Sequence, residues 1–262
     1  KPHIIVGSAG RILELIKKKK ITAHTIKTIV IDEGDRLLDE NNLPTVKAVI
    51  KTTMKDRQLM IFSATINEKT LSIAKSLMKD AEFIKAKSEN AVNPNITHMY
   101  FISEQRDKIE ILRKLVASIN PEKAIVFINK SDETEIITSK LKYHKIKAEG
   151  IHGSSSKEDR QKALEGFRSG KLQLLVASDI AARGLDIKNV SHIFNLDLPS
   201  DTKEYLHRVG RTSRTGEAGT AISIITDKDL SLIKKYEKDF KIEINLKTIY
   251  KGKILDSKKS SI

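Results

Sequence analysis

The stretch Val30-Ile31-Asp32-Glu33-Gly34-Asp35 passes directly from an apolar, β-branched run into carboxylates. Residues 28–31 have the composition of a buried strand, and similar runs recur along the chain with segments of helical period between them. Strands that are apolar throughout and alternate with helices are typical of a parallel sheet that helices cover on both faces. The sequence therefore predicts the α/β class, with doubly wound parallel sheets.

The predicted elements alternate along almost the whole chain. The strands are expected at residues 3–6, 28–31, 59–63, 123–127, 174–177, 192–195 and 221–225. The helices are expected at residues 12–18, 68–78, 108–119, 133–143, 157–167, 203–209 and 230–240.

A polar segment divides the chain into two predicted domains. Residues 85–95 contain Pro94 together with Asn and Ser, which is typical of a linker. Residues 1–84 are short for a complete doubly wound domain, so this first domain is expected to be incomplete, whereas residues 96–245 have a normal domain length. Residues 246–262 are rich in Lys and Ser and are expected to form a basic tail that frays.

The composition excludes several classes of protein. No apolar run approaches the roughly 20 residues that a membrane helix needs. The chain of 262 residues has no Cys, which excludes disulfides, thiolate metal sites and a Cys nucleophile and suits a reducing cytoplasm. The net charge of +14 has two explanations with about even odds. The charge can attract a polyanion such as nucleic acid, or the Lys side chains can simply be solvated.

The acidic turn after residues 28–31 is a candidate catalytic site. Ligands of open α/β sheets bind outside the carboxyl ends of the strands, where Asp32 can hold Mg²⁺ through water. The adjacent Glu33 can polarise a water for attack on a γ-phosphate. A solvated acidic turn is the alternative. The next strand ends in Phe62-Ser63-Ala64-Thr65, whose hydroxyls can bond a neighbouring carboxylate or cap a helix.

Two later segments carry further polar groups. His207-Arg208-Val209-Gly210-Arg211-Thr212-Ser213-Arg214-Thr215-Gly216 places three Arg and one His within eight residues. Guanidinium groups bind phosphate bidentately, so this segment predicts either a nucleotide contact or a basic loop that binds nucleic acid phosphates. The segment from Ser178 to Asp186 follows a predicted buried strand and is rich in small residues, and its Asp residues could contact a ribose.

Together these motifs resemble the DEAD-box helicases of superfamily 2. The resemblance rests on Asp-Glu-Gly-Asp, Ser-Ala-Thr, Ala-Ser-Asp-Ile-Ala-Ala-Arg-Gly-Leu-Asp and His-Arg-Val-Gly-Arg-Thr-Ser-Arg, in family order and with family-like spacing. Weaker matches are Ser8-Ala9-Gly10-Arg11, the strand at residues 125–129, and Ile151-His152-Gly153 with Arg160. The matches run from the first residues to about Thr226.

The resemblance implies two RecA-like domains that close around ATP and single-stranded RNA. ATP and Mg²⁺ are the implied cofactors, and RNA is the implied partner, held mainly through its backbone. The implied roles are Asp32 for Mg²⁺, Glu33 for the attacking water, Arg211 and Arg214 for the γ-phosphate, Asp186 for the ribose, and Asp35, Ser63, Thr65 and His207 for coupling between domains. The implied RNA contacts are Ser8, Gly10, Arg11, Gly153, Arg160, Ser178 and Asp179.

The sequence departs from the family pattern in several places. Gly34 stands where the family has Ala, and since both residues are small we expect little steric change. Ala9 replaces the usual Pro, and Lys157 the usual Gln. No Gly-x-x-x-x-Gly-Lys-Ser/Thr phosphate loop is present, so we expect a truncated chain that hydrolyses no ATP by itself. A non-catalytic RNA-binding scaffold and a DNA helicase of the same superfamily are the alternatives.

Overall fold

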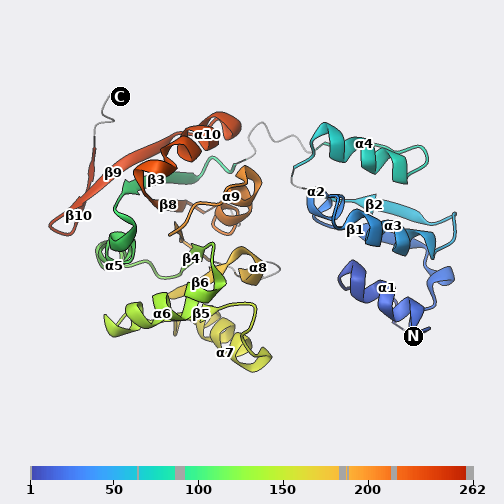
Figure 1. The fold of residues 1–262 in the computed structure, drawn as a ribbon, viewed down its shortest axis with the longest axis horizontal. Coiled ribbons are helices and arrows are strands. Elements are labelled where there is room, and N and C mark those ends of the chain that lie inside the picture. Colours follow the sequence, from blue (N-terminus) through green and yellow to red (C-terminus); the bar gives the residue numbers. More distant parts are fainter. Residues whose placement is uncertain are drawn as a thin grey trace. The chain divides into compact units, whose positions relative to one another are not determined.

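The computed structural model describes residues 2–63, 65–85, 92–182, 187, 189–213 and 217–257. The chain forms two compact units, Lys1–Lys87 and Ser88–Ile262, which are blue to cyan and green to red in Figure 1. Within the described residues, no helix has both the length and the apolar character needed to cross a membrane.

The first unit contains a two-stranded parallel sheet. Its strands are β1 (Thr28–Ile31) and β2 (Gln58–Ile61), paired so that Thr28 lies opposite Gln58 and Ile31 opposite Ile61. Its helices are α1 (Ala9–Lys17), α2 (Gly34–Leu37), α3 (Leu43–Lys51) and α4 (Glu68–Leu77), with a 3₁₀ turn η1 (Ala23–Thr25). The carboxyl ends of both strands therefore lie at one edge of the sheet, where Asp32 and Phe62 follow them.

A small core holds the first unit together. It consists of buried side chains from β1, from α3 and α4, and from the residue after α2: Ile31, Leu38, Val46, Ile50 and Ala74. The predicted strand at residues 3–6 is wrong, because these residues have no strand conformation and are all exposed. An apolar run becomes a strand only when a neighbouring strand pairs with it, and no described strand pairs with this one.

The second unit is built on an eight-stranded sheet with the order β10-β9-β3-β8-β7-β4-β6-β5. Every neighbouring pair is parallel except β9 and β10. The strands are β3 (Ile96–Ile102), β4 (Ala124–Ile128), β5 (Ala148–Ile151), β6 (Leu174–Ser178), β7 (His192–Asn195), β8 (Gly219–Ile225), β9 (Ile244–Tyr250) and β10 (Lys253–Asp256). The helices are α5 (Lys108–Ile119), α6 (Thr134–Tyr143), α7 (Lys157–Arg168), α8 (Asp179–Ala182), α9 (Thr202–Val209) and α10 (Leu230–Phe240), with 3₁₀ turns η2 (Gln105–Asp107), η3 (Ser131–Glu133) and η4 (Asp227–Asp229).

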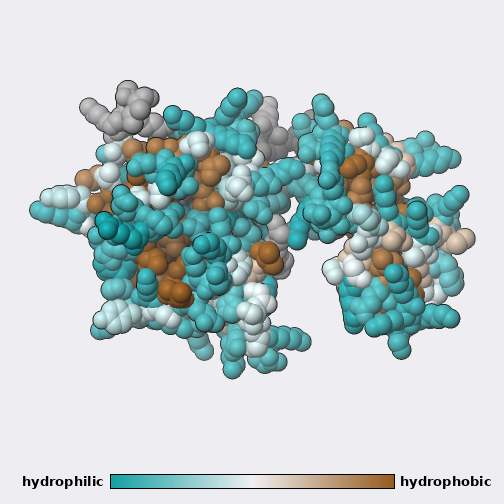
Figure 2. Space-filling view, in the orientation of Figure 1, coloured by the Kyte–Doolittle hydropathy of each residue, from teal (hydrophilic) through white to brown (hydrophobic). Residues whose placement is uncertain are grey.

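Helices cover both faces of this sheet, as the α/β prediction requires. Along β4, Val126 packs with residues of α5 and α6, whereas Phe127 packs with residues of α7 and α8 on the opposite face. Farther along the sheet, α9 and α10 bring Tyr205 and Tyr236 into a third apolar cluster with β3 and β8. Most apolar side chains are thus inside, and the surface visible in Figure 2 is mainly hydrophilic with smaller apolar patches. The doubly wound parallel sheet is therefore confirmed.

Side-chain caps set two of the helix starts that the sequence predicts. Before α7, the Ser156 hydroxyl accepts a hydrogen bond from the Asp159 amide at 3.0 Å. Before α9, the Asp201 carboxylate accepts one from the Lys203 amide at 2.9 Å. Both bonds satisfy an amide that lacks a partner within the helix, which is why the helices begin at Lys157 and Thr202.

The predicted tail is wrong over most of its length. Residues 246–250 belong to β9 and residues 253–256 to β10, and Ile249 and Ile254 pack against the main core. The Ser118 hydroxyl also donates to the Gly252 carbonyl at 2.7 Å, which ties the hairpin to α5. A run rich in Lys can form an edge strand because alternate side chains face solvent while the apolar ones face the core.

The end of the predicted linker also belongs to the second unit. Val92 is buried in the cluster around α9 and α10. Asn93 donates through its amide to both the carbonyl and the hydroxyl oxygen of Ser213, each at 3.0 Å. Residues 92–95 therefore pack as part of the folded unit, while residues 86–91 and 258–262 lie outside the described residues.

A buried histidine should make the second unit less stable in mild acid. His98 is 4% exposed, its Nδ1 lies 2.8 Å from the Tyr205 hydroxyl, and burial lowers its pKa from 6.5 to about 4. Between these two values the unfolded chain takes up a proton that the native unit does not, so stability is full above pH 6.5 and falls as the pH drops towards 4. We expect a loss of about 3 kcal/mol across this window.

Urea unfolding from pH 7.5 to pH 4 measures this loss. His98→Gln should make the slope of stability against pH clearly shallower, because the amide takes up no proton. His192, whose pKa burial also lowers, contributes in the same direction and leaves a residual slope. An unchanged slope in His98→Gln would show that His98 is not the group responsible.

Candidate functional site

In the first unit, a turn bearing carboxylates follows β1. The Asp32 carboxylate is exposed and accepts a hydrogen bond from the Glu33 amide at 2.9 Å. Glu33 has a left-handed backbone with φ of 52°, an uncommon conformation for a residue with a side chain. Its carboxylate is 39% exposed and lies 3.8 Å from the Arg36 guanidinium. Two carboxylates are thus presented at the carboxyl end of a parallel strand, where ligands of such sheets bind.

The segment after β2 fastens this turn. The Gly34 amide donates to the Phe62 carbonyl at 2.9 Å, and the Asp35 amide donates to the Ser63 hydroxyl at 3.0 Å. The Thr65 hydroxyl in turn donates to the Asp35 carboxylate at 2.5 Å. The structure therefore brings Asp35, Ser63 and Thr65 together, with the Thr65 hydroxyl bound to the Asp35 carboxylate and the Ser63 hydroxyl to the Asp35 amide. The Asn67 side chain, not these hydroxyls, caps α4 by accepting from the Thr70 amide.

The donor set suits a hydrated Mg²⁺. Among the described residues, no cluster of three or more His, Cys, Asp or Glu could enclose a metal ion. Mg²⁺ keeps much of its water and usually needs only one or two protein carboxylates together with substrate phosphates. The exposed Asp32 carboxylate beside Glu33 meets that requirement.

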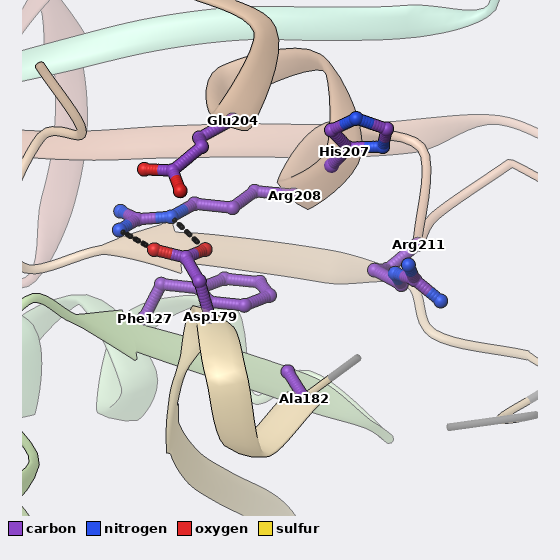
Figure 3. Close-up of a pocket in the computed structure, with 7 residues that line it drawn as sticks. All are labelled: Phe127, Asp179, Ala182, Glu204, His207, Arg208 and Arg211. Atoms are coloured by element: carbon purple, nitrogen blue, oxygen red, sulfur yellow. Dashed lines mark hydrogen bonds and ion pairs between the residues drawn. The ribbon is translucent and has the colours of Figure 1, made fainter. Parts of the chain in front are cut away.

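In the second unit, the arginine segment separates into buried and outward side chains. Arg208, on the last turn of α9, is 1% exposed. Its guanidinium donates to both oxygens of Asp179 at 2.7 and 2.6 Å, and it lies 5.1 Å from the centre of the Phe127 ring. Figure 3 shows Arg208 reaching towards Asp179, while the His207 and Arg211 side chains lie away from that pair. All of these residues line one hollow, shared with Ala182 and Glu204.

Arg208 is also the centre of a wider polar network. It donates to the Asp197 carbonyl at 2.6 Å, to the Asn129 side chain at 2.8 Å and to the Asn195 side chain at 3.4 Å. Buried Lys108 extends the network, since its ammonium lies 3.8 Å from the Asp197 carboxylate. These partners follow or end the neighbouring strands β7, β4 and β6, so the network joins three strands at their carboxyl edge.

The structural role of Arg208 is not predicted by the sequence. The motif by itself suggests only that its arginines face phosphate. The available signal was the helical spacing of Tyr205, Arg208 and Val209, all of which are buried on α9. Helical spacing alone does not identify a partner for a buried arginine, because Asp179 lies 29 residues earlier in the chain.

Two predicted site residues lie outside the described residues. These are Arg214 and Asp186, the second arginine for the γ-phosphate and the residue for the ribose. Arg211, the first of the pair, is described and half-buried, just past the end of α9. His207 lies one turn earlier on that helix.

The residues predicted to contact RNA fall into two groups. Ser8, Gly10 and Arg11 are exposed at the start of α1, and Gly153 is exposed in the loop before α7. An added Cβ at Gly10 or Gly153 would meet nothing within 4 Å, so the sugar-phosphate backbone of a nucleic acid has room to approach both glycines.

The other predicted RNA residues are engaged inside the second unit. Arg160 donates to the Ala181 carbonyl at 2.7 Å. Ser178 is buried, with its hydroxyl 3.0 Å from that of Ser131. Asp179 holds Arg208 through both carboxylate oxygens. Contact of these three with RNA stays a prediction, and the structure shows that each also bonds a neighbouring segment of the second unit.

Comparison with known proteins gives two family matches. Residues 1–73 match the DEAD/DEAH box helicase family, and residues 107–216 match the helicase conserved C-terminal domain. The chain is 38% identical over 260 residues to the DEAD-box ATP-dependent RNA helicase CshC of Bacillus cereus, covering 98% of this chain and 66% of the relative. It is 39% identical over 257 residues to the probable ATP-dependent RNA helicase YfmL of Bacillus subtilis, covering 98% of this chain and 68% of the relative.

A solved structure shows the same likeness in three dimensions. The structure of S. cerevisiae Dbp5 bound to RNA and ADP BeF3 has a TM-score of 0.85 and 30% identity to this chain. The match covers 92% of this chain and 64% of the Dbp5 chain. The present chain therefore spans about two thirds of the length of the relatives it matches.

Proposed function

Because the chain belongs to the DEAD-box family of ATP-dependent RNA helicases, we propose that the whole protein is an RNA-stimulated ATPase that locally unwinds or remodels RNA. The observation that carries this proposal is the carboxylate turn of the first unit. Asp32 and Glu33 are presented at a strand end. Three hydrogen bonds join the following residues, Gly34 and Asp35, to the segment after β2 and hold the turn in place. A protein that only binds RNA does not need two carboxylates held at a ligand site, because carboxylates repel the RNA phosphates.

The candidate site residues suit phosphoryl transfer to water. Asp32 would hold Mg²⁺ through water, and Mg²⁺ would neutralise charge on the phosphates of ATP. The Glu33 carboxylate would orient the attacking water and accept its proton. Arg211, with Arg214, would stabilise the negative charge that develops on the γ-phosphate, and Asp186 would contact the ribose.

Coupling between the domains is part of the same proposal. Thr65 and Ser63 hold Asp35, and we propose that Asp35 communicates with His207 when ATP and RNA are bound. RNA would be held mainly through its backbone by Ser8, Gly10, Arg11, Gly153 and Arg160, with little sequence preference. The net charge of +14 favours such binding at low salt. A cytoplasmic location belongs to the proposal too, supported by the absence of Cys.

RNA-stimulated ATP hydrolysis by the full-length protein tests the proposal. Glu33→Gln keeps the size of the side chain but removes the base, so we expect the turnover rate to fall at least about 100-fold while RNA binding persists. The 262-residue chain itself should release no phosphate above background, since the sequence contains no phosphate loop.

Three results would contradict this view. Unchanged turnover in Glu33→Gln would remove the proposed role of Glu33. Intact RNA binding without hydrolysis by the full-length protein would favour the non-catalytic scaffold. Equal stimulation by single-stranded DNA would favour the DNA helicase.

A further inference from the structure

We propose that Gly34 and Ile61 form a matched pair, in which the missing side chain of Gly34 makes room for a methyl group of Ile61 and so positions the turn of Asp32 and Glu33. In the reaction, both would be positioning residues for Glu33, and that part of the inference rests on the proposed function. The packing itself does not depend on any activity.

The space beside Gly34 is already filled. A Cβ added to Gly34 would lie 2.5 Å from Ile61 Cγ2, 3.3 Å from the Phe62 carbonyl oxygen and 3.6 Å from Ser63 Cβ. Real Cβ atoms essentially never approach another heavy atom within 3.0 Å. Cγ2 is bonded directly to the Cβ of Ile61, so it moves only if the stiff χ1 torsion or strand β2 itself moves. One extra methyl group is therefore too large for this contact.

Backbone conformation does not explain the glycine. The described glycines with positive φ are Gly170 and Gly252, and Gly34 is not among them. Gly34 is the first residue of α2, where alanine is a better helix former than glycine. Packing against Ile61, and not the backbone, therefore accounts for glycine at this position.

The same contact lies beside the most constrained part of the turn. Glu33, the preceding residue, is held in the left-handed region, and the Gly34 amide donates to Phe62 at 2.9 Å. The Asp35 amide, directly after, donates to Ser63 at 3.0 Å. A group that pushed residue 34 away from β2 would strain both bonds and let Glu33 relax to another conformation. The direction of the Glu33 carboxylate thus depends on the fit between residues 34 and 61.

Glycine and alanine are therefore not interchangeable at position 34, contrary to the expectation from their similar size. Gly34 occupies the place where the family has alanine, and both residues are small, but the methyl group of alanine would meet Cγ2 of Ile61. Alanine at position 34 fits a partner at position 61 that is not branched at Cβ. Gly34 and the β-branched Ile61 therefore go together.

A double-mutant cycle in the 262-residue chain tests the pair by thermal unfolding of the first unit. Leucine is an isomer of isoleucine that lacks Cγ2, whereas valine retains it. We expect Gly34→Ala to lower the unfolding temperature of this unit by about 5–10 °C. In the Ile61→Leu background the same substitution should be neutral or stabilising, because the clash is gone and the better helix former remains.

The control is the Gly34→Ala change in the Ile61→Val background, where Cγ2 persists and the loss should persist. An equal loss in the Ile61→Leu and wild-type backgrounds would overturn the proposal, as would Gly34→Ala alone without effect. If heat unfolds both units in one transition, hydrogen exchange of the residue 34 and Asp35 amides measures the same cycle, because these amides bond to Phe62 and Ser63 just after β2.

The catalytic consequence is measured separately in the full-length protein. Gly34→Ala should lower kcat for RNA-stimulated ATP hydrolysis with little change in KM, and adding Ile61→Leu, not Ile61→Val, should restore it. Restored stability without restored kcat would confine the pair to a structural role. Absence of ATP hydrolysis in the wild-type protein would overturn the proposed function while the unfolding cycle still decides the packing.

Discussion

Replacing Arg208 by Gln should lower the free energy of unfolding of the second unit by about 3–5 kcal/mol, the cost of breaking a buried ion pair by removing one partner. The Asp179 carboxylate, 18% exposed, would lose two charge-assisted hydrogen bonds. Oxygens of Asn129 and Asp197 would lose their donor as well. Urea unfolding followed by circular dichroism measures the loss.

A second cycle isolates the ion pair from the rest of the network. Asp179→Asn should be strongly destabilising in the wild-type background, because it leaves the Arg208 charge buried without a counter-charge. In the Arg208→Gln background the same change should cost much less, since no buried cation remains. Arg211→Gln is the matched control, a half-buried arginine three residues later, and should lower stability clearly less than Arg208→Gln. Equal losses of unfolding free energy for Arg208→Gln and Arg211→Gln would show that the Arg208 network does not stabilise the second unit in particular.

Replacing Arg211 by Gln in the full-length protein should slow RNA-stimulated ATP hydrolysis by about 10³–10⁵-fold, the usual contribution of an arginine to a phosphoryl transition state. The fold should survive, because Arg211 is only half-buried and its side chain lies away from the buried Arg208–Asp179 pair (Figure 3). Single-turnover hydrolysis at saturating ATP and RNA measures the chemical step directly. RNA affinity, measured beside it, should change little.

Arg211→Lys provides the control for charge. Lysine keeps the positive charge but lacks the planar fork that binds phosphate oxygens bidentately, so only a small part of the rate should return. Turnover of Arg211→Gln within tenfold of wild type would contradict a role at the γ-phosphate. A large loss of RNA affinity would instead indicate a contact with the nucleic acid backbone.

Arg208 and Arg211 differ in their predicted effects because α9 ends between them. The helix runs to Val209, and the amide of Gly210 still donates to the Leu206 carbonyl at 2.8 Å. Arg208 therefore stays on the buried face of the helix, together with Tyr205 and Val209. Arg211 follows after the chain has left the helical path, and its side chain can lie away from Asp179.

Several strands could not be found from the sequence. β5 is the short run Ala148-Glu149-Gly150-Ile151, and Gly and Glu are poor strand formers in isolation. β9 carries Lys247 among its apolar residues, and β10 begins with Lys253, so local composition favours a solvated tail. β3 contains the buried polar residue His98. Each of these strands forms because a neighbouring strand and the helices above it supply pairing and burial, which local composition does not encode.

The sequence by itself determined the α/β class, the order of most elements and the set of motifs that indicates the family. These features depend on periodicity and spacing over a few residues, so they can be read locally. Only the tertiary structure decided which polar residues lie inside and what they touch. Arg208 meets Asp179 and Asn129, and Gly34 meets Ile61, because the parallel sheets bring distant strand ends to one edge. Those contacts exist only once the strands have paired.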